Sequence, residues 1–235
     1  MNKKRYLIKL SGEAVKGNQT AGISWEATDN FCKRIAKIIK SGVELGFVIG
    51  GGNIFRGASQ DIANYDRLVG DQIGMMSTII NALAFKERMQ ANGIDVLIQS
   101  GIRVEGVAGL FDKNEVEDIF KKGGAVVFCG GLGIPYFSTD TTSALRALQI
   151  GADFVFKATK VDGVYDKDPQ KFNDAKFYDN LTFDEVIRQE LKIMDMSSIL
   201  LMKENNLKLM VFNMSDGVSL EKACNGKKVG TLVER

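Results

Sequence analysis

Four short segments of this sequence are rich in glycine or contain lysine beside glycine, and these residue types can bind phosphate groups. They read KLSGE at 9–13, GGGN at 50–53, GGLGIP at 130–135 and KATKVDGVY at 157–165. Lysine offers a point charge to an anion, and glycine lets backbone N–H groups approach it closely. Each segment overlaps or follows an apolar run that favours a buried β-strand. Because the carboxyl ends of parallel strands meet at one edge of a sheet, we expect the four segments to form one anion-binding site.

The same residues also admit ordinary structural roles, and these alternatives stay open for each segment taken alone. Lys9 with Ser11 and Gly12 could contact a phosphate or form a simple turn. Three glycines followed by Arg56 favour an anion site over a flexible turn, because a guanidinium binds phosphate through two donors. Asp140 is a candidate N-cap of a helix, and it could also lie near a metal ion.

The fourth segment and Asp168 just after it supply residue types that suit a nucleotide. Lys160 could meet a transferring phosphoryl group, Tyr165 could stack on a base, and Asp168 could accept a hydrogen bond from a ribose hydroxyl. Taken alone, each residue is also typical of a solvated loop. An Asp-Gly pair between β-forming residues predicts a small hairpin over 160–165, which would flank the ligand.

The chain of 235 residues contains no histidine, which excludes several kinds of catalytic site. A His-based triad, an HExxH zinc site and a phosphohistidine intermediate cannot form. Phosphoryl transfer can proceed without histidine, because positioning and electrostatics lower most of its barrier. The GxxxxGK[ST] loop is missing, and so is GxGxxG after a first strand, so the common nucleotide-binding fingerprints are absent.

Composition indicates an ordinary globular protein, with 45% hydrophobic and 26% charged residues. The formal net charge of +2 is too small to indicate a nucleic-acid or membrane partner. We find no signal-peptide pattern and no run near the roughly 18 apolar residues that span a bilayer. Cys32, Cys129 and Cys224 are far apart and form no CxxC, so we expect a reducing compartment, the cytoplasm.

Strands and helices that would position these segments alternate along the chain. Strands are expected at 6–10, 43–49, 94–99, 125–129, 154–157 and 207–212. Helices are expected at 26–40, 71–90, 115–122, 141–150, 183–190 and 197–205. Most strand runs are apolar on both faces, as a sheet covered on both sides requires. The sequence therefore predicts a single domain, 1–235, with α/β class, a three-layer α/β/α sandwich and a mainly parallel central sheet.

At these residues the chain resembles the amino-acid kinase superfamily, and within it the bacterial uridylate (UMP) kinases. The matching motifs span essentially the whole length: KLSGE at 9–13, IGGGNIFRG at 49–57, VGDQIGM at 69–75, PYFSTD at 135–140, KATKVDGVYDKDP at 157–169, MD at 194–195 and VFNM at 211–214. The resemblance implies an ATP-dependent kinase that converts UMP to UDP in pyrimidine nucleotide biosynthesis. It also implies direct in-line transfer without a phosphoenzyme, and Mg²⁺ that binds with ATP.

The resemblance implies a role for each motif residue. The implied catalytic residues are Lys9, Arg56, Lys160 and Asp195, of which Asp195 would orient the lysines rather than abstract a proton. The residues implied to bind ATP are Lys9, Leu10, Ser11, Gly12, Gly52, Arg56, Thr159, Tyr165 and Asp168. The residues implied to bind UMP are Gly51, Asp71, Leu132, Gly133, Ile134, Pro135, Tyr136, Phe137, Ser138 and Thr139. Asp140 is the candidate contact for Mg²⁺, which would be held mostly by ATP phosphates.

Assembly and regulation are further implications of the resemblance. Family members are commonly homohexamers, described as trimers of dimers, and such an assembly would cover the apolar side of helix 71–90, although Met75 and Met76 could equally be core residues. Family members respond to GTP and UTP through a segment that corresponds here to Gly17, Asn18, Gln19, Thr20, Ala21 and Gly22. This chain departs from the family's GTGNP pattern, because Leu132 and Ile134 replace a Thr and an Asn. The departure leaves effector response open, whereas the loop amides that serve catalysis are retained.

Two other functions are compatible with the same residues. A kinase of carbamate or of an amino-acid carboxylate would share the fold, and a non-catalytic nucleotide sensor would share the binding loops. The presence of Lys9, Lys160 and Asp195 together favours an enzyme.

Overall fold

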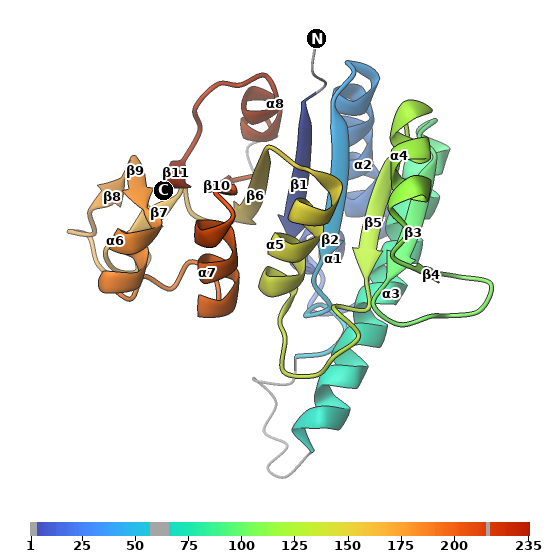
Figure 1. The fold of residues 1–235 in the computed structure, drawn as a ribbon, viewed down its shortest axis with the longest axis horizontal. Coiled ribbons are helices and arrows are strands. Elements are labelled where there is room, and N and C mark those ends of the chain that lie inside the picture. The colour runs from blue at the N-terminus through green and yellow to red at the C-terminus, as the bar shows by residue number, and fades with distance from the viewer. Residues whose placement is uncertain (1–3, 57–65, 215–216) are drawn as a thin grey trace.

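A nine-stranded sheet forms the centre of the protein. The computed structural model describes residues 4–56, 66–214 and 217–235. The strands of this sheet are β1 (Arg5–Leu10), β2 (Glu44–Ile49), β3 (Val96–Ser100), β4 (Gly109–Leu110), β5 (Ala125–Cys129), β6 (Phe154–Thr159), β9 (Asn180–Thr182), β10 (Lys208–Asn213) and β11 (Thr231–Glu234). Their order is β4-β3-β5-β2-β1-β6-β10-β11-β9 (Figure 1). Neighbouring strands are parallel except β10 and β11, among the residues described.

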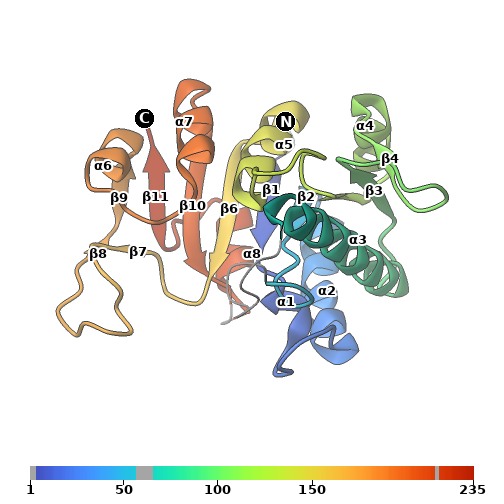
Figure 2. The same cartoon turned by 90° about the horizontal axis from the view of Figure 1, so that it is seen from below.

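Helices cover both faces of the sheet, which Figure 2 shows from below. One face carries α1 (Glu13–Lys16), α2 (Trp25–Lys40), α3 (Arg67–Ala91) and α8 (Ser219–Cys224). The other face carries α4 (Lys113–Lys121), α5 (Thr139–Ile150), α6 (Phe183–Arg188) and α7 (Met196–Glu204). The buried apolar side chains accordingly form two clusters, one on each side of the sheet. The predicted three-layer α/β/α sandwich is therefore confirmed.

The strands next to the centre are buried on both faces, as their continuous apolar runs predict. Every residue of β2 and of β5 is buried. Each predicted strand and helix overlaps an observed element. The elements that the sequence did not predict are short: α1, α8, β4, β9, β11 and the small sheet described next.

The predicted hairpin over 160–165 is wrong. Instead, β7 (Val164–Tyr165) pairs antiparallel with β8 (Phe177–Tyr178), and the two form a separate sheet. Gly163 lies against β11, where a Cβ atom would come within 2.5 Å of Thr231 Oγ1. The Asp-Gly pair therefore meets a need for close approach between distant segments, which local sequence alone does not distinguish from a hairpin turn.

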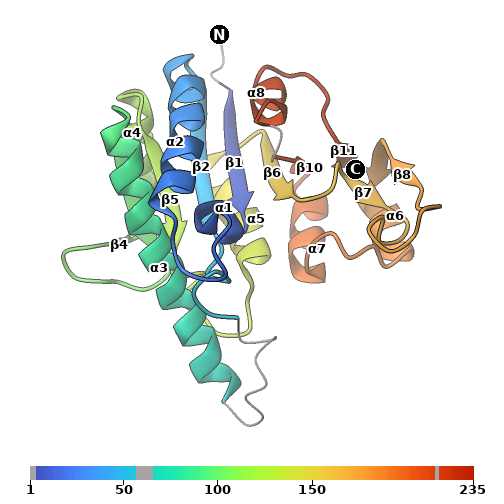
Figure 3. The ribbon, with the colours of Figure 1, turned by 180° about the vertical axis from the view of Figure 1, so that it is seen from behind.

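Helix α3 lies alongside α2 on one face of the sheet (Figure 3). By length and composition α3 could span a membrane, but half of its most apolar stretch is buried inside the fold. Core helices meet the same criteria, so α3 is weak evidence for a membrane span.

One side of α3 is exposed and apolar. The α3 stripe consists of residues that each expose between 42% and 46% of their surface: Val69, Ile73, Met76, Ile80 and Leu83. Met75 is buried, so the adjacent methionines Met75 and Met76 face opposite environments. The apolar side that the sequence indicates for helix 71–90 is thus an uncovered surface in this structure.

Candidate active site

The four glycine- and lysine-rich segments meet at the carboxyl edge of the sheet, at the lower end of the strands in Figure 1. They accompany β1, β2, β5 and β6, which lie in the order β5-β2-β1-β6. The loops after β1 and β2 are tied together, because Gly50 N donates to Leu10 O at 2.9 Å. Gly12 packs so closely on the second loop that a Cβ atom would lie 2.2 Å from Asn53 Oδ1. The predicted convergence of the segments is confirmed.

Two lysines and an aspartate form a buried cluster at the centre of this edge. Lys9 and Lys157 lie opposite each other across β1 and β6. Asp140 bridges them, with Oδ1 at 2.7 Å from Lys9 Nζ and Oδ2 at 3.4 Å from Lys157 Nζ. Their side chains expose only 15% or 16%. Lys157 Nζ also donates to the carbonyl of Ile193. Burial, followed by the charge of Lys9, lowers the pKa of Lys157 below its ordinary value.

Asp140 is free to make these ion pairs because it does not cap its helix. The predicted N-cap is wrong by two residues: Ser138 caps α5, and its Oγ accepts from Asp140 N at 2.9 Å. The Asp140 side chain therefore points from the first turn of α5 to the lysines.

Asp195 lies beside this cluster and binds hydroxyl groups. It caps α7 by accepting from Ser198 N at 2.8 Å, and it also accepts from Thr141 Oγ1 at 2.9 Å and from Ser138 Oγ. Burial acts to raise the pKa of Asp195, but the hydrogen bond from Ser138 and those from Ser198 and Thr141 outweigh it and lower the pKa. In the described chain, then, the carboxylate that pairs with the lysines is Asp140, whereas Asp195 joins the start of α5 to α7.

A second group of charges, the exposed cluster, lies on the solvent side. Glu13 pairs through Oε1 with Arg56 Nη2 and through Oε2 with Lys160 Nζ, each at 2.5 Å. Arg56 Nε also donates to Gly52 O at 3.0 Å. Lys160 exposes 72% of its side chain, so it is not part of the buried lysine pair. The motif that contains Arg56 ends at Gly57, which lies outside the described residues.

A cavity of about 360 Å³, the α3 cavity, opens between α3 and the loops after β2 and β5. It is lined by Gly51, Gly52, Phe55, Arg67, Gly70, Asp71, Gly74, Met75, Thr78, Gly131, Phe137, Ser138 and Thr139. Asp71 accepts from Arg67 Nε at 2.9 Å and from Tyr136 N at 2.7 Å. At Gly51 a Cβ atom would lie 2.7 Å from Ser77 Cβ, so glycine is required where the loop crosses α3. The cavity combines backbone, hydroxyl and carboxylate groups with one arginine.

A larger cavity of about 510 Å³, the β6–β7 cavity, lies on the other side of β1. Three residues predicted to contact a nucleoside, Thr159, Tyr165 and Asp168, line it together with Lys157. The ring of Tyr165 packs edge-on against Phe177, with centroids 5.3 Å apart. Because Lys157 belongs both to this wall and to the buried cluster, the cavity adjoins the charged centre of the site.

The family model described as the amino acid kinase family matches residues 4–213. The chain belongs to the amino acid kinase family. Its structure is similar to that of UMP kinase from Bacillus anthracis, with a TM-score of 0.93, 34% identity and coverage of 98% of this chain and 96% of the other. UMP kinase from Ureaplasma parvum is similar with a TM-score of 0.93 and 33% identity, and the match covers 100% of both chains. Uridylate kinase from Archaeoglobus fulgidus gives 0.73 and 26%, covering 97% of this chain and 99% of the other.

In this amino acid kinase, only some of the residues in the loop after β5 that were predicted to bind UMP line the α3 cavity. Phe137, Ser138 and Thr139 line the α3 cavity together with Gly51 and Asp71. The preceding residues are not among those that line it: Leu132, Gly133, Ile134, Pro135 and Tyr136. Tyr136 has a φ of 72°, an uncommon value for a side-chain-bearing residue, and its N–H points to Asp71. Ile134 and Tyr136 expose 55% and 68% of their surface.

Two asparagines connect the segment 17–22 to the loop after β2. Asn53, which is 3% exposed, donates to Gly22 O at 2.9 Å and to Asn81 Oδ1 at 3.0 Å. Asn81 Nδ2 in turn donates to Gly50 O at 2.8 Å. Hydrogen bonds through Asn53 and Asn81 thus connect Gly22 to the loop after β2.

Sequence reasoning missed three contributors to the site. Lys157 is the first residue of the KATKVDGVY segment, in which only Lys160 is predicted to meet the phosphoryl group. Glu13 was part of the KLSGE motif without a role of its own, and Asn53 was read only as the end of a glycine loop. Lys157 could have been found from the β1 and β6 runs, because parallel strands place their carboxyl-end lysines side by side.

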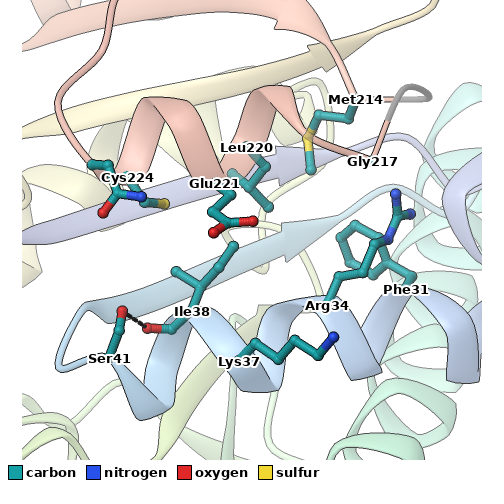
Figure 4. A pocket seen from close by; sticks show the side chains of 11 residues that line it. Phe31, Arg34, Lys37, Ile38, Ser41, Met214, Gly217, Leu220, Glu221 and Cys224 are labelled. Carbon is teal, nitrogen blue, oxygen red and sulfur yellow. Dashed lines mark hydrogen bonds between the residues drawn. The ribbon is translucent and has the colours of Figure 1, made fainter.

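A further cavity of about 380 Å³ lies between α2 and α8 and contains none of the predicted site residues. Figure 4 shows Arg34 and Lys37 pointing from α2 and Glu221 pointing from α8. Its floor is apolar, with Phe31 and Leu220. Cations and a carboxylate share its rim, so its charge does not select an anion as clearly as the sheet edge does.

Proposed function

We propose that this amino acid kinase transfers the γ-phosphoryl group of ATP to UMP. The observation that carries the proposal is the arrangement of the two cavities, which lie on either side of β1 with the buried and exposed clusters between them. A two-substrate phosphotransferase needs such an arrangement, with cations where the phosphates of both substrates meet. The similarity to UMP kinases from two bacteria supports UMP as the acceptor.

The nucleoside of ATP would occupy the β6–β7 cavity. Tyr165 offers a ring edge and face to a base, and Thr159 and Asp168 offer polar groups to a sugar. Its phosphates would extend to Lys157, Lys9 and the amides of the loop after β1.

UMP would occupy the α3 cavity. Asp71 is the carboxylate that would accept hydrogen bonds from the ribose, in place of those it now accepts from Arg67 and Tyr136. Ser138 and Thr139 would face the base or the sugar, because both line the same cavity. The acceptor phosphate would then lie towards the loop that contains Gly51 and Gly52.

Transfer would be direct and in line between the two nucleotides. Lys9 and Lys157 are fixed near the point where the equatorial oxygens of the phosphoryl group would lie, and they would stabilise charge there without reorganising. An acceptor phosphate is already ionised at neutral pH, so no general base is needed. The lowered pKa of Asp195 fits a carboxylate that holds hydroxyl groups and does not accept a proton.

A divalent ion would enter with ATP. The described residues contain no group of three His, Cys, Asp or Glu side chains that could hold a metal ion. Mg²⁺ needs only one or two protein carboxylates when substrate phosphates and water complete its shell. Asp140, which pairs with the two buried lysines, is the carboxylate that would contact the ion. Bound Mg²⁺ would further neutralise the phosphate oxygens.

An acceptor screen tests the proposal. The purified protein with ATP and Mg²⁺ is offered UMP, CMP, glutamate, aspartate or carbamate, and ADP release is measured by a coupled assay. We expect turnover with UMP. Turnover with a carboxylate or carbamate instead would assign the other kinase class, and no turnover with any acceptor would indicate a nucleotide sensor. Repeating the UMP assay with GTP and with UTP tests the response to effectors. We propose that phosphorylation of UMP by this protein serves pyrimidine nucleotide synthesis in the cytoplasm.

Assembly into a homohexamer, as a trimer of dimers, is part of the proposal. The α3 stripe is an uncovered apolar surface of the kind that subunit contacts bury. Met76→Glu places a charge in the middle of this stripe and should reduce the mass measured by light scattering. A wild-type chain that is a monomer at micromolar concentration would contradict the assembly.

A further inference from the structure

The exposed cluster holds a carboxylate between two cations that come from opposite sides of the site. Glu13 begins α1, directly after the loop that follows the central strand β1. Arg56 lies in the segment after β2, and Lys160 directly follows β6, so the two flank β1 in the sheet order. The two oxygens of Glu13 lie 2.5 Å from Arg56 Nη2 and 2.5 Å from Lys160 Nζ.

We propose that Glu13 is an electrostatic placeholder, whose carboxylate occupies the position of phosphoryl oxygens until a triphosphate displaces it. The inference rests on the proposed function, in that Arg56 and Lys160 are taken as phosphate-binding cations. A carboxylate and a phosphoryl group offer oxygens of similar geometry to a guanidinium and an ammonium group. An arriving triphosphate would repel the carboxylate and attract both cations, so the ion pairs exchange partners.

The surroundings of Glu13 allow such an exchange. Arg56 exposes 51% and Lys160 72% of its side chain, so both cations can turn without disturbing the core. The carboxylate of Glu13 is the group that joins these two like charges, which would otherwise repel each other. The carboxylate thus holds them close together, and it competes with the phosphates that they would bind.

The charge of Glu13 is present at neutral pH. The hydrogen bond from Lys160, and then that from Arg56, lower the pKa of Glu13 against the opposing effect of burial. A neutral replacement of the same shape therefore removes the competing charge while leaving the local fold in place.

Nucleotide binding by variants at this position tests the inference. Calorimetry measures the Kd of the non-hydrolysable ATP analogue AMP-PNP with Mg²⁺ at low salt. Glu13→Gln should lower this Kd by about three- to tenfold, as the loss of two exposed ion pairs implies. Glu13→Asp keeps the charge on a shorter side chain and should lie between wild type and Glu13→Gln.

A matched control is Glu234→Gln, which removes an exposed carboxylate that pairs with Lys208 at 2.8 Å, far along the sheet from β1. Its Kd for AMP-PNP should equal that of wild type. A Kd for Glu13→Gln that is unchanged or higher would overturn the inference, because the carboxylate would then position the cations rather than compete for them.

The same measurements separate this inference from the proposed function. If wild type binds AMP-PNP but forms no UDP from UMP, the proposed acceptor is wrong, and the binding series still decides the role of Glu13. If UDP forms and Glu13→Gln does not bind more tightly, only the placeholder is wrong. A wild-type protein that does not bind AMP-PNP would overturn both.

Discussion

Two carboxylates at the carboxyl edge of the sheet each join two cations, and their surroundings differ. Asp140 lies between Lys9 and Lys157, and all three side chains expose only 15% or 16%. Glu13 lies between Arg56 and Lys160, which expose 51% and 72%. Burial strengthens electrostatic interactions, whereas solvent and salt weaken them at exposed positions. The same arrangement of charges is therefore held firmly in one place, whereas its members can exchange partners more readily in the other.

The buried cluster is built into the core elements of the fold. Lys9 and Lys157 lie on paired central strands, and Asp140 lies in the first turn of a helix that packs on them. Burial and the charge of Lys9 lower the pKa of Lys157, and the charge of Asp140 acts in the opposite direction. Preorganised charges of this kind stabilise a transition state without moving. The exposed cluster comes from the first residue of the short helix α1 and from two loops, which suits it to ligand capture.

The largest effect should follow from removing a buried cation. Lys9→Ala should lower kcat for UMP phosphorylation by about 10³-fold, or about 4 kcal/mol, because fixed donors to the transferring group act mainly in the transition state. The Kd for UMP, measured by calorimetry, should change little.

Lys37→Ala is the control for this experiment, since Lys37 lines the cavity between α2 and α8 and not the proposed site. Its kcat should match that of wild type. A change in KM alone for Lys9→Ala would contradict a role of Lys9 in the transition state and would make the buried cluster a binding element.

The next largest effect is on stability, where substitutions of the two carboxylates should change the free energy of unfolding by different amounts. Asp140→Asn leaves two buried ammonium groups without a counter-ion and should reduce the free energy of unfolding by about 3 kcal/mol. Glu13→Gln should cost less than about 1 kcal/mol, because its partners are exposed. Urea unfolding of both variants measures the difference, and equal losses would mean that the exposure of the two clusters does not govern their energetics.

A third carboxylate, Asp195, sharpens the comparison through pH. Its pKa in the folded protein is lowered below the ordinary value of 3.8, so it contributes stability above that pH, and this contribution is lost as the pH falls through the folded pKa. Asp195→Asn should cost about 2 kcal/mol at pH 7, the range of hydrogen bonds to a charged group. Its deficit against wild type should shrink in acid. A deficit that is constant down to pH 3 would show that the hydrogen bonds do not depend on the charge.

The sequence predicted the part of the site that local patterns determine. Apolar runs ending in glycine and lysine placed Lys9, Gly51 and Arg56 at one edge of a parallel sheet, and the structure brings them there. The roles of the charges were harder to predict, because they depend on register. Only the pairing of β1 with β6 puts Lys157 opposite Lys9. Only the meeting of loops after β1, β2 and β6 joins Glu13 to its two cations.

Signals with two structural meanings account for the remaining errors. Ser138 and Asp140 are both good caps, and Ser138 takes that position so that Asp140 can face the lysines. The Asp-Gly pair at 162–163 has the composition of a hairpin turn, yet the glycine is needed for contact with Thr231 on a late, short strand. Tertiary packing decides such cases, and a local sequence pattern does not show which distant segments will be in contact.

The smallest expected effect is a salt-dependent change in the KM for ATP, which should distinguish the two clusters. Lys160→Gln removes a cation that exposes 72% of its side chain, and it should raise the KM for ATP by about fivefold at low salt, the range of an exposed ion pair. Because the Debye length falls below about 10 Å above 0.1 M salt, the difference between variant and wild type should nearly vanish at 0.5 M. The effect of Lys9→Ala on kcat should persist at the same salt concentration, since its surroundings exclude solvent. If both effects faded equally with salt, the buried cluster would act at a distance through solvent and not by contact with the phosphates.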